Sequence, residues 1–332
     1  MYLMRGSLLP PFVYHPSYSC AWPSAHRFPM WKFKDLHSTL SSLGLVTPSN
    51  LHMPRSDPPH EWFTAVHDPD YYEAFLEGAL EPAAARRIGF NEEMRKDGLI
   101  LRTRLEVSGT IKTVQLALEH GLAANLAGGT HHAHASFGSG FTILNDMAVA
   151  ARWAQRETAA RKIAIVDLDV HQGDGTATIF QGDDSVFTFS MHCGTNFPFR
   201  KAESDLDIDV PKGTADRAYL AMLRDALPSL LAAQRPDLVI YDAGVDPYEG
   251  DQLGHLKLSH AGLYQRDLYV IESCVQRQIP IACVIGGGYD RDRRALARRH
   301  ALVHRACAKV WTRRRQLQLQ GAGAAERDTH DS

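Results

Sequence analysis

The sequence has few cysteines, no long apolar run and almost no net charge. Its five cysteines are scattered and form no CxxC pair, so no disulfide framework is expected and a reducing, cytoplasmic location is predicted. No stretch approaches the ~20 apolar residues of a membrane helix, and the N-terminus lacks the apolar core of a signal peptide. A formal net charge of −2 argues against electrostatic binding of nucleic acid. We therefore expect neither a membrane nor a nucleic acid as partner.

The composition is that of an ordinary globular protein, with 44% hydrophobic and 22% charged residues in a chain of 332. We find no internal repeat and no convincing linker, which predicts a single catalytic domain over residues 1–315. Residues 316–332, QLQLQGAGAAERDTHDS, are predicted to be a disordered C-terminal tail.

The most informative stretch is Ile163–Gly175, with the sequence IAIVDLDVHQGDG. Its first four residues, Ile163–Val166, are apolar and predict a strand buried on both faces of a parallel sheet. If the backbone stays extended beyond them, Asp167, Asp169 and His171 project to one side. Two carboxylates and an imidazole that converge at a strand end need a cation or hydrogen bonds to offset the cost of burial.

A plainer interpretation of this stretch assigns the aspartates structural roles only. Gly173 and Gly175 flank Asp174, which suits a tight loop that enters a helix, and Asp174 would then cap that helix. Asp167 would simply end the strand. Capping accounts for one aspartate but not for the alternating row of acids and histidine.

Three further apolar runs predict buried strands, and each bears polar or glycine residues only past its carboxyl end. These strands are Val186–Phe189, Leu238–Tyr241 and Ile281–Ile285, and the predicted helices between them are Tyr219–Ala233 and Ser259–Gln278. Alternation of strands and helices predicts an α/β fold with a central, mostly parallel sheet flanked by helices. In such sheets ligands bind at the carboxyl ends of the strands.

The remaining elements are predicted from helix start and stop signals. Helices are expected over Phe33–Leu43 and over Glu106–His120, each followed by a glycine, and Asn145 is placed to cap another. Residues 1–30 are rich in proline and aromatics and are expected to be extended or looped. The charge-mixed segment Glu77–Lys96 is expected to be a surface loop with short helices.

Asp169, His171 and Asp246 offer two oxygens and one nitrogen as metal ligands, without a thiolate. Three protein ligands with one open position describe a catalytic rather than a structural metal site. This set suits Zn²⁺, and Fe²⁺, Co²⁺ or Mn²⁺ would also be accepted. A bound ion would lower the pKa of its water toward ~7 and polarise a substrate carbonyl.

A hydrolase also needs groups that move protons. The tandem His131–His132 can supply them, and Asp167 and Asp174 can pair with these histidines to fix their tautomers. Tyr289 follows three glycines and could swing in to donate a hydrogen bond to a developing oxyanion. Each feature is weak alone, since tandem histidines often lie on surfaces and GGGY is often only a turn.

Together these motifs identify the chain as similar to the histone deacetylase family of zinc amidohydrolases. The motifs occur in the order GGTHHAHASFGSGFTILND, DLDVHQGDGT, FSMH, NFPFRK, AGVDPYEGDQLG and IGGGYD. The resemblance runs from about Tyr14 to about Val310, and NFPFRK with DPYEGDQLG is similar to the class IV branch and its bacterial-type relatives. It implies the single-domain arginase–deacetylase fold.

The resemblance also implies a role for each matching residue. The zinc ligands would be Asp169, His171 and Asp246. The catalytic residues would be His131, paired with Asp167, His132, paired with Asp174, and Tyr289. His132 would act first as general base and then as general acid. The substrate-binding residues would be Gly140, Phe141, Phe197 and Leu253. A structural K⁺ would contact side chains of Asp167, Asp169 and Ser190 and backbone oxygens of His171 and Met191. The substrate would be an acyl-lysine in a peptide or protein, or an acylated small amine.

The sequence departs from the family in two places and leaves alternatives open. The loop after His132 is short and uncharged, and the rim aspartate of class I enzymes has no clear counterpart within Glu81–Lys96.

An acetylpolyamine amidohydrolase would use the same centre, and acids such as Glu249 and Asp251 near the entrance would favour it. A ureohydrolase would need DAHxD instead of DLDVH. A binding module without activity would have lost a ligand or the tyrosine. Cys193 is interpreted as a packing residue rather than a redox-sensitive thiol.

Overall fold

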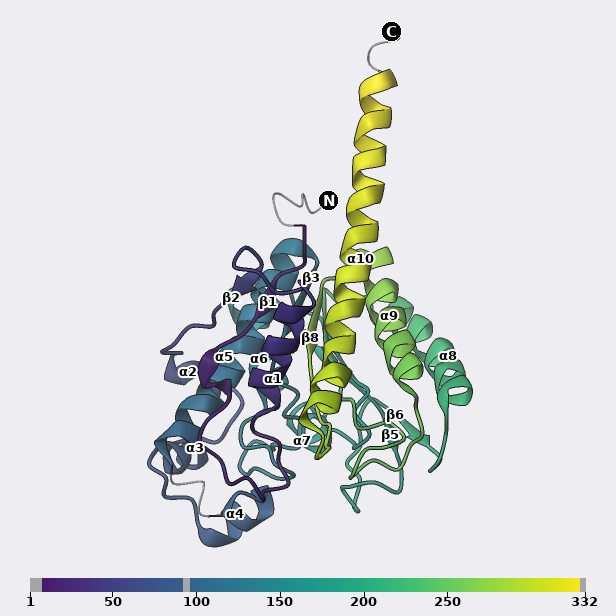
Figure 1. Ribbon diagram of the computed structural model, residues 1–332. Helices are drawn as coiled ribbons and strands as arrows, with labels where there is room; N and C mark the ends of the chain where they lie inside the picture. Colours follow the sequence, from purple (N-terminus) through teal and green to yellow (C-terminus); the bar gives the residue numbers. More distant parts are fainter. Residues whose placement is uncertain (1–7, 92–95, 329–332) are drawn as a thin grey trace.

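In the computed structural model, which describes residues 8–91 and 96–328, eight strands form one fully parallel sheet (Figure 1). The strand order is β2-β1-β3-β8-β7-β4-β5-β6. The strands are β1 (Phe12–Val13), β2 (Leu51–His52), β3 (Leu122–Asn125), β4 (Ile163–Asp167), β5 (Val186–Cys193), β6 (Leu206–Val210), β7 (Leu238–Asp242) and β8 (Ile281–Val284). The predicted α/β class and parallel sheet are confirmed.

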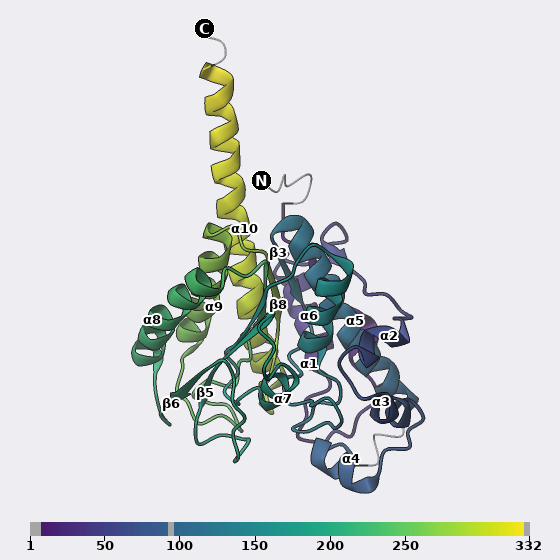
Figure 2. The ribbon, with the colours of Figure 1, turned by 180° about the vertical axis from the view of Figure 1, so that it is seen from behind.

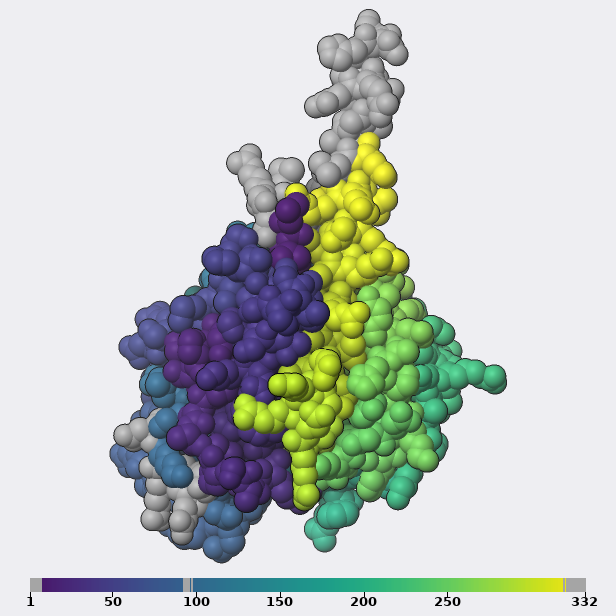
Figure 3. All heavy atoms as spheres, viewed as in Figure 1, coloured from purple at the N-terminus to yellow at the C-terminus, as the bar shows by residue number. Residues whose placement is uncertain are grey.

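Helices cover both faces of the sheet. One face carries α1 (Lys32–Ser42), α8 (Asp216–Gln234), α9 (His260–Gln276) and α10 (Arg293–Asp328), and the opposite face carries α2 (His60–Thr64), α5 (Asp97–His120), α6 (Asp146–Glu157) and α7 (Asp174–Ile179) (Figures 1 and 2). Shorter elements are η1 (Pro16–Tyr18), α3 (Pro69–Leu76) and α4 (Pro82–Ile88). Figure 3 shows α10 filling the surface between the N-terminal segments and α9.

The central strands are apolar because both of their faces lie under helices. All five residues of β4 and of β7 are buried, and so are all four of β8. In register, Asp167 at the end of β4 lies between Ser190 of β5 and Asp242 of β7. The polar residues that follow these strands therefore meet at one edge of the sheet, where the sequence predicted the site.

Local signals end the helices as expected. The Asn145 side chain accepts a hydrogen bond from the backbone N–H of Ala148 at 2.9 Å and so caps α6. Gly121, at φ +87°, ends α5 in the left-handed conformation that favours glycine. The described part of the chain contains no helix with both the length and the apolar character needed to span a bilayer.

Two expectations differ from the structure. Helix α10 continues from Arg293 to Asp328, so most of the segment expected to be a disordered tail is helical, and it extends beyond the body of the molecule (Figure 1). Its leucine, glutamine, alanine and arginine residues are good helix formers, which explains the continuation. The boundary of the catalytic domain at residue 315 stays a prediction. The backbone also bends at residues 169–171, beyond the end of β4 at Asp167.

Candidate active site

Three buried side chains with metal-binding atoms meet past the carboxyl ends of β4 and β7. Asp169 and His171 follow β4, and Asp246 follows β7. The His171 Nδ1 atom lies 2.9 Å from Asp169 Oδ1 and 3.1 Å from Asp246 Oδ2. One ligand atom of each residue lies within 4.8 Å of the other two. The structure thus brings together the three residues predicted to hold a divalent ion, although the backbone between them is bent.

This donor set fits a divalent cation. Asp246 Oδ2 is buried and, although His171 Nδ1 lies 3.1 Å away, accepts no well-aligned hydrogen bond from the residues that the structure describes. The other carboxylate oxygens are fixed by the backbone: Gly287 N–H donates to Asp169 Oδ2 at 2.7 Å, and Val170 N–H donates to Asp246 Oδ1 at 2.9 Å. Two carboxylates buried side by side are costly without a compensating positive charge. Two oxygens and one nitrogen on three residues match a catalytic metal site.

The tandem histidines form two separate pairs with aspartates. His131 Nδ1–H donates to Asp167 Oδ2 at 2.7 Å, and His132 Nδ1–H donates to Asp174 Oδ1 at 2.6 Å. These are the pairs that the family resemblance implied. Asp174 also lies 3.3 Å from the Nε2 atom of His134, which the sequence analysis did not single out. Since Asp174 is bonded to imidazoles and Gly173 is the residue that precedes α7, the helix-capping interpretation of Asp174 is wrong.

The two paired histidines differ in charge. Burial lowers the pKa of His131, but the carboxylates of Asp167 and Asp169 outweigh burial and hold that pKa well above its usual range. Burial, followed by the charge of His131, lowers the pKa of His132 to about 4. These shifts favour the charged form of His131 and the neutral form of His132, whose second ring nitrogen can accept a proton.

The carboxylate of Asp146 fixes the loop that carries the histidines. This carboxylate accepts hydrogen bonds from the backbone N–H of Gly129 at 3.1 Å and of Thr130 at 2.7 Å. A Cβ atom at Gly129 would lie 2.5 Å from the Cα of Gly286, so only glycine allows these two loops to approach so closely. The histidines are thus placed by contacts between distant loops.

Tyr289 is buried beside the metal donors, and its backbone is held on both sides. Its N–H donates to Asp251 Oδ2 at 2.7 Å, and its carbonyl oxygen accepts from Gln252 N–H at 3.1 Å. Burial, with the charges of Asp246 and Asp169, raises the pKa of Tyr289 well above its usual range, so the phenol keeps its proton. The loop is therefore pinned in the structure, whereas the sequence suggested a tyrosine that swings in.

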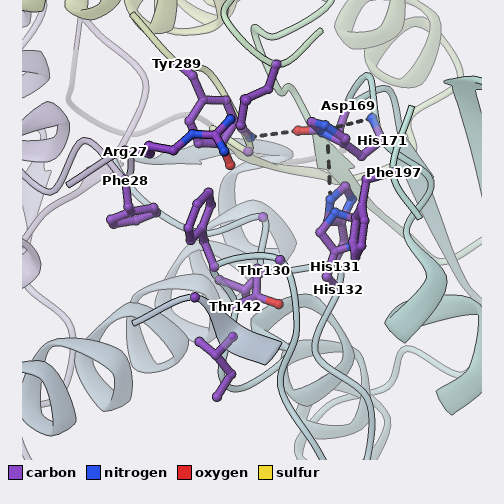
Figure 4. Close-up of a pocket in the computed structure, with 18 of the residues that line it drawn as sticks. Arg27, Phe28, Thr130, His131, His132, Thr142, Asp169, His171, Phe197 and Tyr289 are labelled. Carbon is purple, nitrogen blue, oxygen red and sulfur yellow. Dashed lines mark hydrogen bonds and ion pairs between the residues drawn. The ribbon is translucent and has the colours of Figure 1, made fainter. Parts of the chain in front are cut away.

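A cavity of about 470 Å³ leads to these groups, and the four predicted substrate-binding residues all line it. They are Gly140, Phe141, Phe197 and Leu253. The Phe197 ring meets the His132 ring edge to face with centroids 4.9 Å apart (Figure 4). The centroid of the Phe141 ring lies 5.9 Å from that of Tyr289. Phe141 adopts φ +68°, a strained conformation for a bulky residue of the kind that clusters at functional sites.

Three of the residues implied for a monovalent cation, Asp167, Ser190 and Met191, lie on the paired strands β4 and β5, and the other two, Asp169 and His171, follow β4. Ser190 is the ladder partner of Asp167, and Met191 follows it in β5. The Ser190 hydroxyl lies 3.0 Å from His192 Nδ1. The role of Asp167, Asp169, His171, Ser190 and Met191 in binding K⁺ stays a prediction.

The sequence analysis missed several buried charged residues next to the site. They are Asp242, Lys32, Arg266 and the ion pair of Arg102 with Glu106. Asp242 groups with His131 and Asp167, and the Lys32 Nζ donates to the Gly286 carbonyl at 2.8 Å. Asp251 was considered only as an acid at the entrance, but three backbone N–H groups donate to it. Cys193 is buried and free, in agreement with a packing role.

Arg266 braces the loops that carry the metal donors. Its guanidinium donates to the carbonyl oxygens of Leu168 at 3.0 Å and Gly244 at 2.7 Å, and it pairs with Asp267 at 2.8 Å. Arg266→Ala leaves the buried Asp267 charge and both carbonyls unpaired. We expect the free energy of unfolding to fall by about 3–5 kcal/mol in urea denaturation.

Arg277→Ala is the matched control for Arg266→Ala, because Arg277 is exposed just past the end of the same helix. It is expected to change the free energy of unfolding by no more than about 0.5 kcal/mol. An equal loss in both variants would contradict the bracing role of Arg266.

Comparison with known families gives a match over most of the chain. The model of the histone deacetylase domain matches residues 26–306. This chain belongs to the histone deacetylase family. The family resemblance read from the motifs is thereby confirmed.

Relatives of this histone deacetylase family protein include an uncharacterised protein of Picosynechococcus sp. It is 52% identical over 301 residues, which cover 91% of this chain and 99% of that protein. Histone deacetylase 2 of Arabidopsis thaliana is 36% identical over 189 residues, or 56% of this chain and 49% of that protein. The acetoin utilization protein AcuC of Bacillus subtilis is 28% identical over 93% of this chain and 82% of its own.

Solved structures confirm the fold. A histone deacetylase homologue from Aquifex aeolicus superposes with a TM-score of 0.76 at 22% identity, over 91% of this chain and 84% of that one. The HD domain of HDA15 gives a TM-score of 0.71, also at 22% identity, over 91% and 90% of the two chains. This deacetylase family member therefore has the expected single-sheet fold, and its family is that of hydrolases acting on amide bonds.

Proposed function

We propose that this protein is a zinc-dependent amidohydrolase that removes the acyl group from an acyl-lysine or a similar acylated amine. The observation that carries the proposal is the presence of two Asp–His pairs and a buried three-donor metal set along one cavity. Family membership favours Zn²⁺ as the ion, and the same donors would accept Fe²⁺ or Co²⁺. Asp169, His171 and Asp246 would hold it.

When bound, the ion supplies Lewis-acid chemistry by polarising the amide carbonyl and acidifying a water molecule. His132, which Asp174 orients, takes the proton of the attacking water and later gives it to the leaving amine. His131, oriented by Asp167, is mainly an electrostatic partner and stabilises the negative charge that develops. Positioned acid–base groups of this kind contribute about 10²–10⁴-fold in rate.

Tyr289 completes the reaction by donating a hydrogen bond to the oxygen of the former carbonyl. The hydrogen bonds of its backbone fix the loop that carries this phenol along the cavity, which favours a preorganised donor. Phe141 and Phe197 grip the methylene chain of the substrate, with Gly140 offering its carbonyl to the amide and Leu253 at the rim. A K⁺ ion near Asp167 and Ser190 would neutralise the carboxylates below the site.

The structure gives less support to the alternatives. Neither Glu249 nor Asp251 lines the cavity, and Asp251 is occupied by backbone N–H groups, so no acid of the described residues at the entrance favours an acetylpolyamine. The family match favours deacylation over ureohydrolysis. Every position whose loss would mark an inactive binding module is occupied. A cytoplasmic location, with neither membrane nor nucleic acid as partner, stays part of the proposal.

The proposal is tested with a panel of peptides that carry acetyl- to myristoyl-lysine, beside acetylated polyamines, each assayed with and without a chelator. We expect hydrolysis of at least one acyl-lysine, lost on chelation and restored by Zn²⁺. Binding of acyl-lysine peptides with no turnover after zinc is restored would support an inactive module instead. Hydrolysis of the polyamines alone would contradict the acyl-lysine assignment.

A further inference from the structure

The solvent-exposed charges that line the cavity are all positive. Arg27 and Arg87 are both exposed lining residues, and His255 adds an exposed imidazole. The two carboxylates of the lining, Glu106 and Asp169, are buried at the base of the cavity. Within the described residues, the entrance therefore presents guanidinium groups to a substrate and no carboxylate.

A contact between two distant segments joins the parts of the chain that carry the two arginines. The His26 ring Nε2–H donates to the carbonyl oxygen of Gly89 at 2.9 Å. This bond joins the residue before Arg27 to the residue that ends the helix containing Arg87. Figure 4 shows Arg27 reaching into the cavity beside Tyr289.

Neither guanidinium is neutralised by an acid of the described residues. The Arg87 guanidinium lies 4.6 Å from the centre of the Phe137 ring, and no carboxylate within residues 8–91 and 96–328 pairs with it or with Arg27. Arg293, in contrast, pairs with Asp35 at 2.7 Å. The positive charge at the entrance is thus available to a ligand.

We propose that this entrance selects acylated amines that carry a carboxylate close to the acylated side chain. The proposal rests on the deacylase function and names its substrate class: an acyl-lysine next to aspartate or glutamate, or free Nε-acyl-lysine with its own carboxylate. Guanidinium groups bind carboxylates in a two-point geometry that neutral groups cannot reproduce. A polycationic amine would be repelled by the same groups.

The geometry of an extended peptide fits this assignment. With the acylated lysine in the cavity, its backbone lies at the entrance, and neighbouring residues follow at about 3.3 Å each. We infer that a carboxylate one position before or after the lysine meets the long side chains of Arg27 and Arg87, which line the same cavity. Both contacts are solvent-exposed, so each is screened by salt and moderate in strength.

The test uses peptides that are identical except for the residues flanking acetyl-lysine, which are Asp or Asn, together with free Nε-acetyl-lysine and its carboxamide. The ratio of kcat/KM for the acidic to the neutral member is measured for the unaltered protein, Arg27→Gln, Arg87→Gln and the double variant. We expect the unaltered protein to prefer the acidic member and each substitution to lower the ratio roughly 2- to 5-fold. Each substitution should change this ratio by raising KM for the acidic member, with kcat unchanged.

Controls separate charge selection from general damage. Arg86→Gln removes an exposed arginine of the same helix that does not line the cavity, and it should keep the preference. Raising the ionic strength should reduce the preference in the unaltered protein. Peptide binding, measured by fluorescence anisotropy, reports the same ratio without turnover, so failure of catalysis and failure of charge selection are distinguished.

Equal kcat/KM and equal binding for the acidic and the neutral member of both pairs, the peptides and free acetyl-lysine with its carboxamide, would overturn the proposal, and so would a preference that survives in the double variant. Loss of the preference in Arg86→Gln alone would overturn it as well. An arginine-dependent preference seen only with free acetyl-lysine would support the carboxylate site and assign it to a small molecule. The same preference seen with peptides would assign it to acidic protein segments.

Discussion

Asp246→Ala is expected to yield folded protein that holds no divalent metal and hydrolyses no acyl-lysine peptide. The substitution removes one of three ligands, and the two that remain bind a catalytic ion poorly. Loss of a hydrogen-bond partner of a ligand already costs roughly 10–100-fold in metal affinity, and loss of the ligand itself should cost more. Elemental analysis of the purified protein measures the effect independently of activity.

Glu249→Gln is the matched control for Asp246→Ala, since Glu249 is an exposed acid three residues further along the same loop. It should keep one metal ion per chain. Asp246→Asn preserves the shape of the side chain and separates loss of the ligand charge from loss of packing. Full metal occupancy in Asp246→Ala would show that the ion is held elsewhere.

Tyr289→Phe is expected to lower kcat by about 10²–10³-fold while metal content and fold stay unchanged. The substitution removes only the phenolic O–H, the group that would stabilise the oxyanion. The backbone bonds of this residue to Asp251 and Gln252 do not involve the hydroxyl, so the loop should keep its position. Steady-state kinetics and metal analysis on the same preparation test the prediction.

Tyr248→Phe provides the comparison for Tyr289→Phe. Tyr248 is half-buried nearby, packs against the ring of His260 with centroids 4.7 Å apart, and does not line the cavity. It should retain normal turnover. An unchanged kcat in Tyr289→Phe, or an equal loss in both variants, would remove Tyr289 from the mechanism.

Much of the fold could be predicted because burial leaves a strong sequence signal. Strands β4, β7 and β8 lie under helices on both faces, so they read as continuous apolar runs. The polar residues that end them were correctly expected at one edge of the sheet. The Asn145 cap and the stop at Gly121 were predictable because each depends on one residue type with a local geometric role.

The remaining strands lack that signal. Strand β1 has only two residues, and β3 is LAAN, whose alanines have low strand propensity. Strand β6, LDIDV, lies at the edge of the sheet and alternates between half-buried and exposed residues, so its aspartates resemble a loop. Pairing with neighbouring parallel strands, rather than local preference, determines these three elements.

The site residues were predictable where the chemistry requires certain residue types at a fixed spacing in the sequence. The DLDVH motif gave the donors Asp169 and His171, which are neighbours in sequence. Asp246 follows another strand, and the pairing of His131 with Asp167 and of His132 with Asp174 was implied by the family resemblance. Lys32 and Arg27 carry no such pattern: Lys32 meets Gly286 across 254 positions of the chain. For Arg266 a signal existed, since Arg266–Asp267 places two charges on the buried face of an amphipathic helix.

The most direct test of this account is a titration of metal-stripped protein with Zn²⁺ while hydrolysis of an acetyl-lysine peptide is followed. We expect no hydrolysis without metal and a rise in rate that saturates at one equivalent of Zn²⁺ per chain. The Asp246→Ala variant should show neither binding nor a rise in rate. Stripped protein that cleaves the peptide as fast as the metal-loaded form would contradict the central claim.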